Sequence, residues 1–169
     1  SERYKSRSIT RVFDKRIGDA VTLSALESAM LRVNDMPGIA AAAVFSPGGK
    51  VGHTNMRVNI VEEKDFDGYV RFDNYGLEST GDFRFLTGVA INNVTGHTDK
   101  LSVDLIKTWH PGDLRNARIN YEITEPSLRH TFGIGYSETR YDVEALSIDV
   151  EGDTETVSYT HLTLPTIRL

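Results

Sequence analysis

The sequence contains no cysteine, a single tryptophan, and no apolar run longer than the seven residues from Ile39 to Phe45. Without cysteine, disulfide scaffolds, thiolate zinc sites and cysteine nucleophiles are excluded. The apolar run is far shorter than the roughly 18 residues that a membrane-spanning helix requires. The strands of a membrane β-barrel need only about 9–11 alternating residues, so the lack of long apolar runs does not exclude them.

Positive charge is also scarce. Lys and Arg total 19 against 24 for Asp and Glu, which gives a net charge of -5, and no basic run is present. We therefore expect no nucleic-acid partner, because such a partner requires a basic face. The 169 residues are enough for one ordinary domain or two small ones. Because the chain begins at Ser1 without a methionine, we expect its natural start to lie upstream.

Catalytic and metal-binding motifs are missing. The five histidines show neither an H-E-x-x-H motif nor a pair at i and i+4. The glycine-rich turns lack the lysine of a P-loop, so we expect no nucleotide partner. Asp73, Asp82 and Asp104 have no partner base, and no G-x-S-x-G motif occurs. The sequence predicts no catalytic residue, no metal, no cofactor and no enzymatic activity.

Helical periodicity marks the first part of the chain. Ile9, Val12 and Phe13 have the i, i+3, i+4 spacing of a helix over residues 5–16. A second helix is capped by Thr22 or by a capping box at Ser24. Pro37 and Gly38 end this second helix. Its apolar stripe consists of Leu26, Ala29, Met30 and Val33.

Two strands follow the second helix. Residues 39–45 form the first predicted strand, residues 46–49 a turn, and residues 55–61 a second strand with alternating apolar positions. The charged residues at 62–65 then interrupt the apolar pattern. We place a domain boundary there, which separates a domain over residues 1–62 from a second region over residues 63–156.

The second region has a period close to two residues. Turn residues separate its alternating segments, which predicts successive antiparallel strands joined by hairpins. The apolar positions of the five segments are Val70 and Phe72; Phe83, Phe85, Val89 and Ile91; Leu101, Val103 and Leu105; Ala117, Ile119, Tyr121 and Ile123; and Phe132, Ile134 and Tyr136. This pattern indicates an up-and-down sheet.

Two architectures fit this alternation. A barrel wall in a membrane turns its apolar face to lipid and its polar face to a wet lumen. A soluble sheet with one face packed on a core has the same alternation. Alternation alone leaves both open.

The last stretch departs from the pattern. Residues 157–169 contain Pro165 and no glycine turn, and they are similar to the translation of a transposase sequencing adapter. We therefore expect these residues to be non-native.

Two motifs resemble those of a known family. The first is the helix that ends in Asn34-Asp35-Met36-Pro37-Gly38, and the second is Asp73-Asn74-Tyr75-Gly76 followed by Thr80-Gly81. Their order and spacing are similar to those of the hemolysin secretion and activation proteins, the outer-membrane transporters of two-partner secretion. The resemblance extends over roughly residues 23–156.

A third landmark matches in part. The family commonly has G-x-G-D-x-L where this chain has Gly96-His97-Thr98-Asp99-Lys100-Leu101, so the chain departs from the pattern at His97 and Thr98.

The resemblance implies an α+β polypeptide-transport-associated (POTRA) domain in the periplasm, over residues 1–62. Antiparallel up-and-down strands of an incomplete outer-membrane β-barrel would follow over residues 63–156, in a family whose complete barrel has sixteen strands. Residues 63–156 suffice for about five of them. The implied function is the export, without nucleotide hydrolysis, of a large exoprotein that reaches the POTRA domain unfolded. The implied partners are this exoprotein and outer-membrane lipid.

The resemblance also suggests where partners bind. We expect the unfolded exoprotein to add as a strand to the edge of the POTRA-like sheet, because main-chain hydrogen bonds bind an extended chain with little regard to its sequence. The candidate edge consists of Ile39, Ala40, Ala41, Ala42, Ala43 and Val44. Tight packing of these alanines under the helices is the alternative.

The candidate lumen-facing residues are Arg71, Asp73, Arg84, Arg118, Asn120 and Glu122. Ordinary interior charge pairing is the alternative for this set. For the whole chain, the alternatives are a barrel-assembly insertase of the same superfamily and a small soluble α+β binding module.

Overall fold

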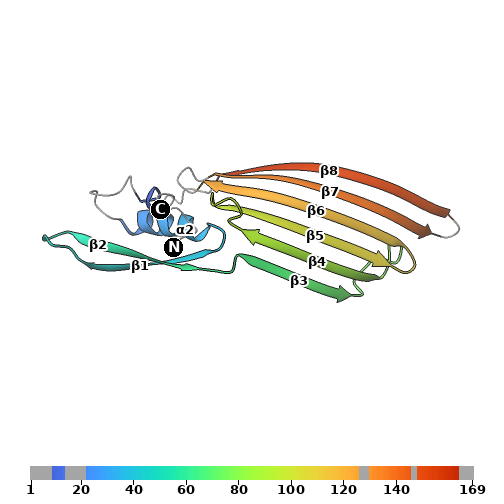
Figure 1. Ribbon diagram of the computed structural model, residues 1–169, viewed down its shortest axis with the longest axis horizontal. Helices are drawn as coiled ribbons and strands as arrows, with labels where there is room; N and C mark the ends of the chain where they lie inside the picture. Colours follow the sequence, from blue (N-terminus) through green and yellow to red (C-terminus); the bar gives the residue numbers. More distant parts are fainter. Residues whose placement is uncertain (1–8, 14–21, 126–129, 146–147, 164–169) are drawn as a thin grey trace.

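The structure is a computed structural model that describes residues 9–13, 22–125, 130–145 and 148–163. A helix and a two-stranded hairpin lie at one end of a six-stranded sheet (Figure 1). The elements are α2 (Leu23–Asn34), β1 (Ile39–Pro47), β2 (Thr54–Glu62), β3 (Phe66–Asp73), β4 (Phe83–Asn92), β5 (Asp99–Trp109), β6 (Asp113–Glu125), β7 (His130–Ala145) and β8 (Ile148–Thr163).

The small hydrophobic core lies between the helical segments and the hairpin. Its buried members are Ile9, Val12, Ala29, Val33, Met36 and Ile39. Partly buried Phe13, Ala41 and Ile60 pack against them. The spacing that predicts the first helix therefore selects residues that reach the core, although most of residues 5–16 lie outside the described residues. The stripe predicted on the second helix supplies Ala29 and Val33.

The ends of α2 differ in part from the prediction. Thr22 is the N-cap but makes no side-chain capping bond, and Ser24 lies inside the helix, so the capping box predicted at Ser24 is wrong. At the other end the C-cap is Asp35, and Gly38 has a φ of 76°. The reversal into β1 needs this left-handed backbone, which glycine adopts without strain.

The hairpin of β1 and β2 is antiparallel, with Ala41 opposite Ile60. Side chains alternate between the two faces of a strand. Ile39, Ala41 and Ala43 therefore point toward α2, whereas Ala42 and Val44 point away from it and are exposed. The predicted strands over residues 39–45 and 55–61 are confirmed, each extended by one or two residues at its ends.

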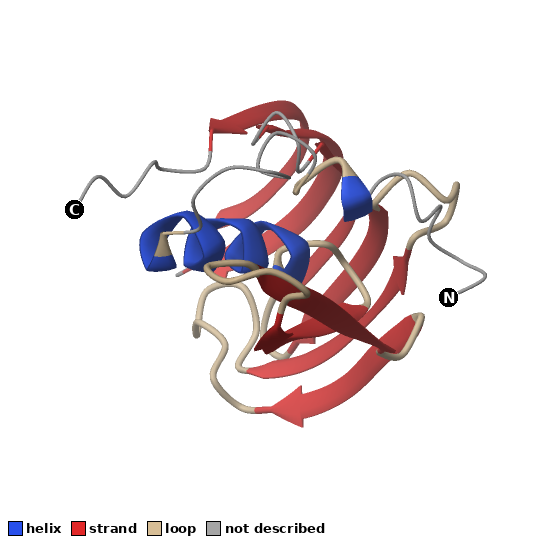
Figure 2. Ribbon diagram, turned by 90° about the vertical axis from the view of Figure 1, so that its left-hand side faces the viewer, coloured by secondary structure: helices blue, strands red, loops and turns tan. Residues whose placement is uncertain are grey.

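The large sheet follows the chain order β3-β4-β5-β6-β7-β8, and every neighbouring pair is antiparallel. Figure 2 shows that its strands form a curved, open wall, with α2 and the hairpin in front of one end. We call this end, next to α2, the near end, and the opposite end the far end. No helix in the described part of the chain is long and apolar enough to cross a membrane.

Cross-strand partners share a face of the sheet, so the register fixes two faces. One, called the polar face, carries Tyr69, Arg71, Asp73, Arg84, Ser102, Asp104, Arg118, Asn120 and Glu122. The other, called the apolar face, carries Val70, Phe72, Phe83, Phe85, Val89, Ile91, Leu101, Val103, Leu105, Ile119, Tyr121, Phe132, Ile134 and Tyr136. The face assignment predicted from alternation is confirmed in all five segments.

The end of the sheet differs from the prediction. Alternation predicts a fifth strand only as far as Ser137, but β7 continues to Ala145 and pairs with β8, which gives six strands. Beyond Tyr136, the positions in line with the apolar residues are Glu138, Arg140 and Asp142, so the apolar signal stops while the strand continues. β8 includes residues 157–163, and the non-native origin of residues 157–169 stays a prediction.

Three residues, 63–65, connect the hairpin to the sheet at the near end. The Glu63 amide donates to the Gly38 carbonyl (2.9 Å), which extends the β1–β2 ladder. The side-chain amide of Asn92 donates to the Lys64 carbonyl (3.1 Å), and the backbone N–H of Asn92 donates to the Asp65 carbonyl (2.7 Å). The connection is therefore fastened to the end of β4.

The β4–β5 turn, also at the near end, is organised by Asp99, whose side chain is fully buried. Its carboxylate accepts hydrogen bonds from the Thr95 amide (3.1 Å) and the Tyr121 hydroxyl (2.9 Å). Thr98, just before it, has a φ of 61°, which is strained for a β-branched residue. The Thr98 hydroxyl donates to the Thr124 carbonyl (2.7 Å) and ties the turn to β6.

Thr98→Ala should lower the free energy of unfolding by about 1–3 kcal/mol, because it removes a buried hydrogen bond and keeps a side chain at positive φ. Thr98→Gly removes the same bond but relieves the backbone strain, so its loss should be smaller. Denaturant unfolding of both variants measures the order. A larger loss for glycine than for alanine would contradict the assignment of strain at Thr98.

Candidate functional site

The first candidate site is the edge of β1 that does not pair with β2. The Glu63 amide donates to Gly38, and the Gly48 amide donates to His53 (2.8 Å), so even-numbered residues of β1 bond to β2. The N–H and C=O groups of odd-numbered residues therefore point to the other edge. Among the described residues, no strand pairs with this second edge.

Asn34, the last residue of α2, covers part of that edge. Its Oδ1 accepts from the Ala41 amide (2.6 Å), and its Nδ2 donates to the Ala41 carbonyl (3.2 Å). Of the six predicted edge residues, Ala40, Ala42 and Val44 face β2 with their backbone groups, and Ile39 is 3% exposed. Ala43 keeps outward-facing N–H and C=O groups, and the structure adds Phe45, which the sequence did not suggest.

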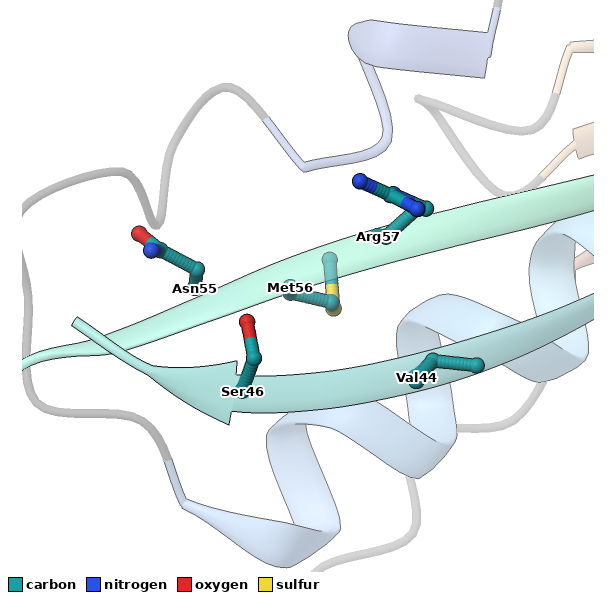
Figure 3. A pocket seen from close by; sticks show the side chains of 5 residues that line it. All are labelled: Val44, Ser46, Asn55, Met56 and Arg57. Atoms are coloured by element: carbon teal, nitrogen blue, oxygen red, sulfur yellow. The ribbon is translucent and has the colours of Figure 1, made fainter.

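A pocket of about 520 Å³ lies on the hairpin (Figure 3). Val44 and Ser46 line it from β1, and Asn55, Met56 and Arg57 line it from β2. Val44 is opposite Arg57 in the register, and Ser46 is opposite Asn55, so these four side chains share the hairpin face that points away from α2.

The second candidate site is the polar face of the sheet, which carries all six predicted lumen residues. The structure brings two of them into contact: Arg84 Nε lies 2.7 Å from Asp73 Oδ1. The same oxygen accepts from the Tyr75 amide (3.1 Å), and the Arg84 guanidinium lies 6.0 Å from the centre of the Tyr75 ring. The Asp73–Gly76 motif therefore forms a turn that is closed by a charge pair.

Gly76 completes this turn. A Cβ atom on Gly76 would overlap the carbonyl oxygen of Gly81, so only glycine fits. The turn is fastened to its neighbour at the far end, because the Thr108 hydroxyl donates to the Thr80 carbonyl and the Asp82 amide donates to the His110 carbonyl (2.8 Å).

The other predicted lumen residues do not join this pair. Arg71 is exposed on β3, and Arg118, Asn120 and Glu122 lie on β6, two strands beyond Arg84. A Cβ atom on Gly135 of β7 would overlap the Asn120 side chain, so this glycine makes room for it.

The polar face holds a further pair, Tyr69 and Asp104, that was not predicted from the sequence. The Tyr69 hydroxyl donates to Asp104 Oδ1 (3.0 Å), and the pair reaches across Gly88 of β4, which lies between them in the register. The signal available in the sequence was that alternation places Tyr69 with Arg71 rather than with Val70.

The apolar face is open to its surroundings. Val70 is 72% exposed, Phe72 61% and Ile134 60%. From Phe83 to Ile91, β4 places apolar side chains on this face over about 26 Å, at about 3.3 Å per residue. At the far end, Phe72 lies 5.5 Å from Trp109 and 6.2 Å from Phe83 between ring centres.

A charged row bounds the apolar face on β5 to β7. The register aligns Lys107, Arg115 and Arg140 across these strands. Asp113 pairs with Arg115 (3.0 Å) and Lys107 (3.8 Å), and Arg140 pairs with Asp153 (3.3 Å). Within the described residues, no group of three or more His, Asp or Glu side chains is placed to hold a metal ion.

Comparison with known proteins defines the family. The family model of the haemolysin secretion/activation protein ShlB/FhaC/HecB matches residues 52–161, well over half of the chain. The chain belongs to this family of outer-membrane two-partner secretion transporters. The resemblance inferred from the two motifs is confirmed.

Individual proteins similar to this chain support the same family assignment. The chain is 34% identical over 145 residues to the heme/hemopexin transporter protein HuxB of Haemophilus influenzae strain 86-028NP, covering 85% of this chain and 25% of that protein. It is 26% identical over 159 residues to the outer membrane transporter CdiB of Dickeya dadantii strain 3937, covering 89% and 28%. The chain thus spans about a quarter of the length of these relatives.

The fold also has a solved counterpart. The structure of CdiB from Escherichia coli superposes with a TM-score of 0.67 at 21% identity, over 94% of this chain and 30% of that chain. The open antiparallel sheet described here is therefore similar in fold to part of a CdiB barrel.

Arg84→Ala should lower the unfolding midpoint of the protein more than Arg71→Ala. Both variants remove an arginine from the polar face, but only Arg84 pairs with an aspartate whose side chain is 11% exposed. Adding Asp73→Ala to Arg84→Ala should cost less than the sum of the single changes, as measured by a double-mutant cycle of thermal unfolding. Equal shifts for the two arginine variants would show that the Asp73–Arg84 pair does not stabilise the turn.

Proposed function

We propose that this chain is part of an outer-membrane transporter that secretes a large partner exoprotein by two-partner secretion. In this proposal residues 1–62 are a periplasmic POTRA-like domain, and the sheet is one section of the barrel that forms the pore. The observation that carries the proposal is the two-faced, open sheet joined by three residues to a hairpin whose outer edge directs backbone groups of Ala43 and Phe45 outward. The protein has no catalytic role in this proposal.

The apolar face contacts outer-membrane lipid in this proposal. Its side chains are exposed, and aromatic rings gather at its far end, where the aromatic girdle of a barrel meets the membrane interface. The row of Lys107, Arg115 and Arg140 marks the level at which the strands leave the hydrocarbon. The far end then points outward, and the near end, with α2, faces the periplasm.

The polar face lines the lumen. Arg71, Arg118, Asn120 and Glu122 offer charged and amide groups along a wet path, while Asp73 pairs with Arg84 and Tyr69 pairs with Asp104 within the wall. Charged groups cost little in contact with a polar lumen, whereas facing lipid they would each cost several kcal/mol, on the order of 2–4 for a cation at the midplane.

The unfolded exoprotein docks at the outer edge of β1 before it enters the pore. Ala43 and Phe45 direct N–H and C=O groups outward, and an extended chain satisfies such groups by adding a strand. Val44 and Ser46 of this edge strand also line the pocket on the hairpin, which receives side chains of the added strand.

The family match favours export over the two alternatives, a barrel-assembly insertase and a soluble α+β module. The exposed apolar face also argues against a soluble module, because a soluble sheet of this size would bury that face.

Val103→Lys should destabilise the folded protein in lipid bilayers by about 2–4 kcal/mol, because a lysine near the middle of the apolar face is buried in hydrocarbon. Ser102→Lys places the same charge on the polar face and should change stability much less. Denaturant unfolding in bilayers measures both. Equal losses for the two variants would contradict the assignment of the apolar face to lipid.

Ala43→Pro should reduce secretion of the partner exoprotein roughly fivefold or more, because it removes an outward N–H group from the docking edge. The β1–β2 ladder keeps its bonds, since Ala43 does not bond to β2. Ala42→Val keeps every backbone donor and changes an exposed side chain, so it serves as the matched control. Normal secretion by a correctly folded Ala43→Pro protein would exclude this edge.

A further inference from the structure

The side chain of Asn34 lies at the edge of β1 that is proposed to bind the exoprotein. Its carboxamide contains one C=O and one NH₂ group, the same donor and acceptor as a peptide unit. Both bond to Ala41, the only β1 residue between Ile39 and Ala43 whose backbone groups point outward. The side chain therefore occupies the place that the N–H and C=O groups of one residue of an added antiparallel strand would take.

We propose that Asn34 is a built-in cap that restricts the added strand to the part of the edge at Ala43 and Phe45. This inference rests on the proposed docking of an unfolded exoprotein segment at β1. It assigns a role to the first residue of the Asn34-Asp35-Met36-Pro37-Gly38 motif, which joins α2 to β1.

The opposite limit of the edge is also fixed by the sequence. Pro47 is the next odd-numbered residue after Phe45, and proline has no N–H group to donate. The open stretch thus offers two N–H and two C=O groups, between the Asn34 cap and Pro47. A docked segment of about five residues satisfies all four groups, since a strand directs alternate residues to one side.

Such a short stretch suits a transport site. A segment held by a few main-chain hydrogen bonds is released readily, because each contributes only about 0.5–1.5 kcal/mol net. The cap also limits edge-to-edge pairing with other chains, which a long free strand edge promotes. The β1 residues that line the pocket, Val44 and Ser46, flank Phe45 of this stretch, and no residue next to Ala41 lines it.

The test uses the full protein in detergent and an acetylated and amidated nonapeptide of alternating threonine and valine with a lysine at each end, one of which carries a fluorophore. Asn34→Ala uncovers both Ala41 groups and should tighten peptide binding about threefold to tenfold, as measured by anisotropy. Without peptide, the Ala41 amide should exchange hydrogen faster in this variant than in the natural protein. Asn59→Ala, which removes an exposed asparagine on β2, is the control and should change neither quantity.

The outcomes separate the cap from the docking site. Unchanged affinity in Asn34→Ala, with binding abolished by Ala43→Pro, overturns the cap and leaves the docking site intact. Ala43→Pro can be introduced into the natural protein and into the Asn34→Ala variant. If it leaves the affinity for the peptide unchanged in both, the docking site itself is overturned. Self-association of Asn34→Ala that the peptide does not reverse would identify a second copy of the chain as the occupant, and overturns the proposal.

If Asn34→Ala does not fold, Asn34→Asp replaces it. The carboxylate still accepts from the Ala41 amide but cannot donate to the Ala41 carbonyl. Amide exchange at Ala41 should then stay slow, with a smaller gain in affinity than expected for alanine. Fast exchange at Ala41 in the natural protein would by itself overturn the cap.

Discussion

The hydrogen-bonded register of neighbouring antiparallel strands is the constraint on which this structure depends. Each strand from β3 to β7 pairs with the next one along the chain, and a shift by one residue would exchange the two faces of the sheet. The pairs on the polar face and the exposed rings on the apolar face both follow from this register. The turns at the two ends hold it, through Asp99 at the near end and through the Asp73–Gly76 turn at the far end.

Much of this arrangement was predictable, because the side-chain period of a strand is two and the sequence alternates with that period. Alternation placed Arg71, Arg84 and Arg118 on one face, and the motifs identified the family. Alternation did not predict the strand beyond Tyr136. There Glu138 and Arg140 take the positions of apolar residues, although β7 continues and pairs with β8. The alternation of side chains therefore ends at Tyr136, whereas the backbone pairing of β7 with β8 continues to Ala145.

The contacts of the candidate sites were less predictable, because they depend on which backbone groups face outward and not on composition. The run from Ala40 to Ala43 suggested an open edge, yet only the register and the Asn34 side chain show which of these residues is free. The role of Thr98 also became visible only in the structure. This residue stands at the second glycine of the family pattern G-x-G-D, and the structure gives it the positive φ that explains a preference for glycine there.

The short connection between the hairpin and the sheet has a consequence for transport. Residues 63–65 span at most about 10 Å when extended, and Asn92 holds them against β4. In the proposed function, an exoprotein segment docked on β1 is therefore confined to a small volume at the near end of the sheet. Under that proposal, the confinement raises the effective concentration of the exoprotein at the entrance of the pore, so that entry is an intramolecular step rather than a second encounter.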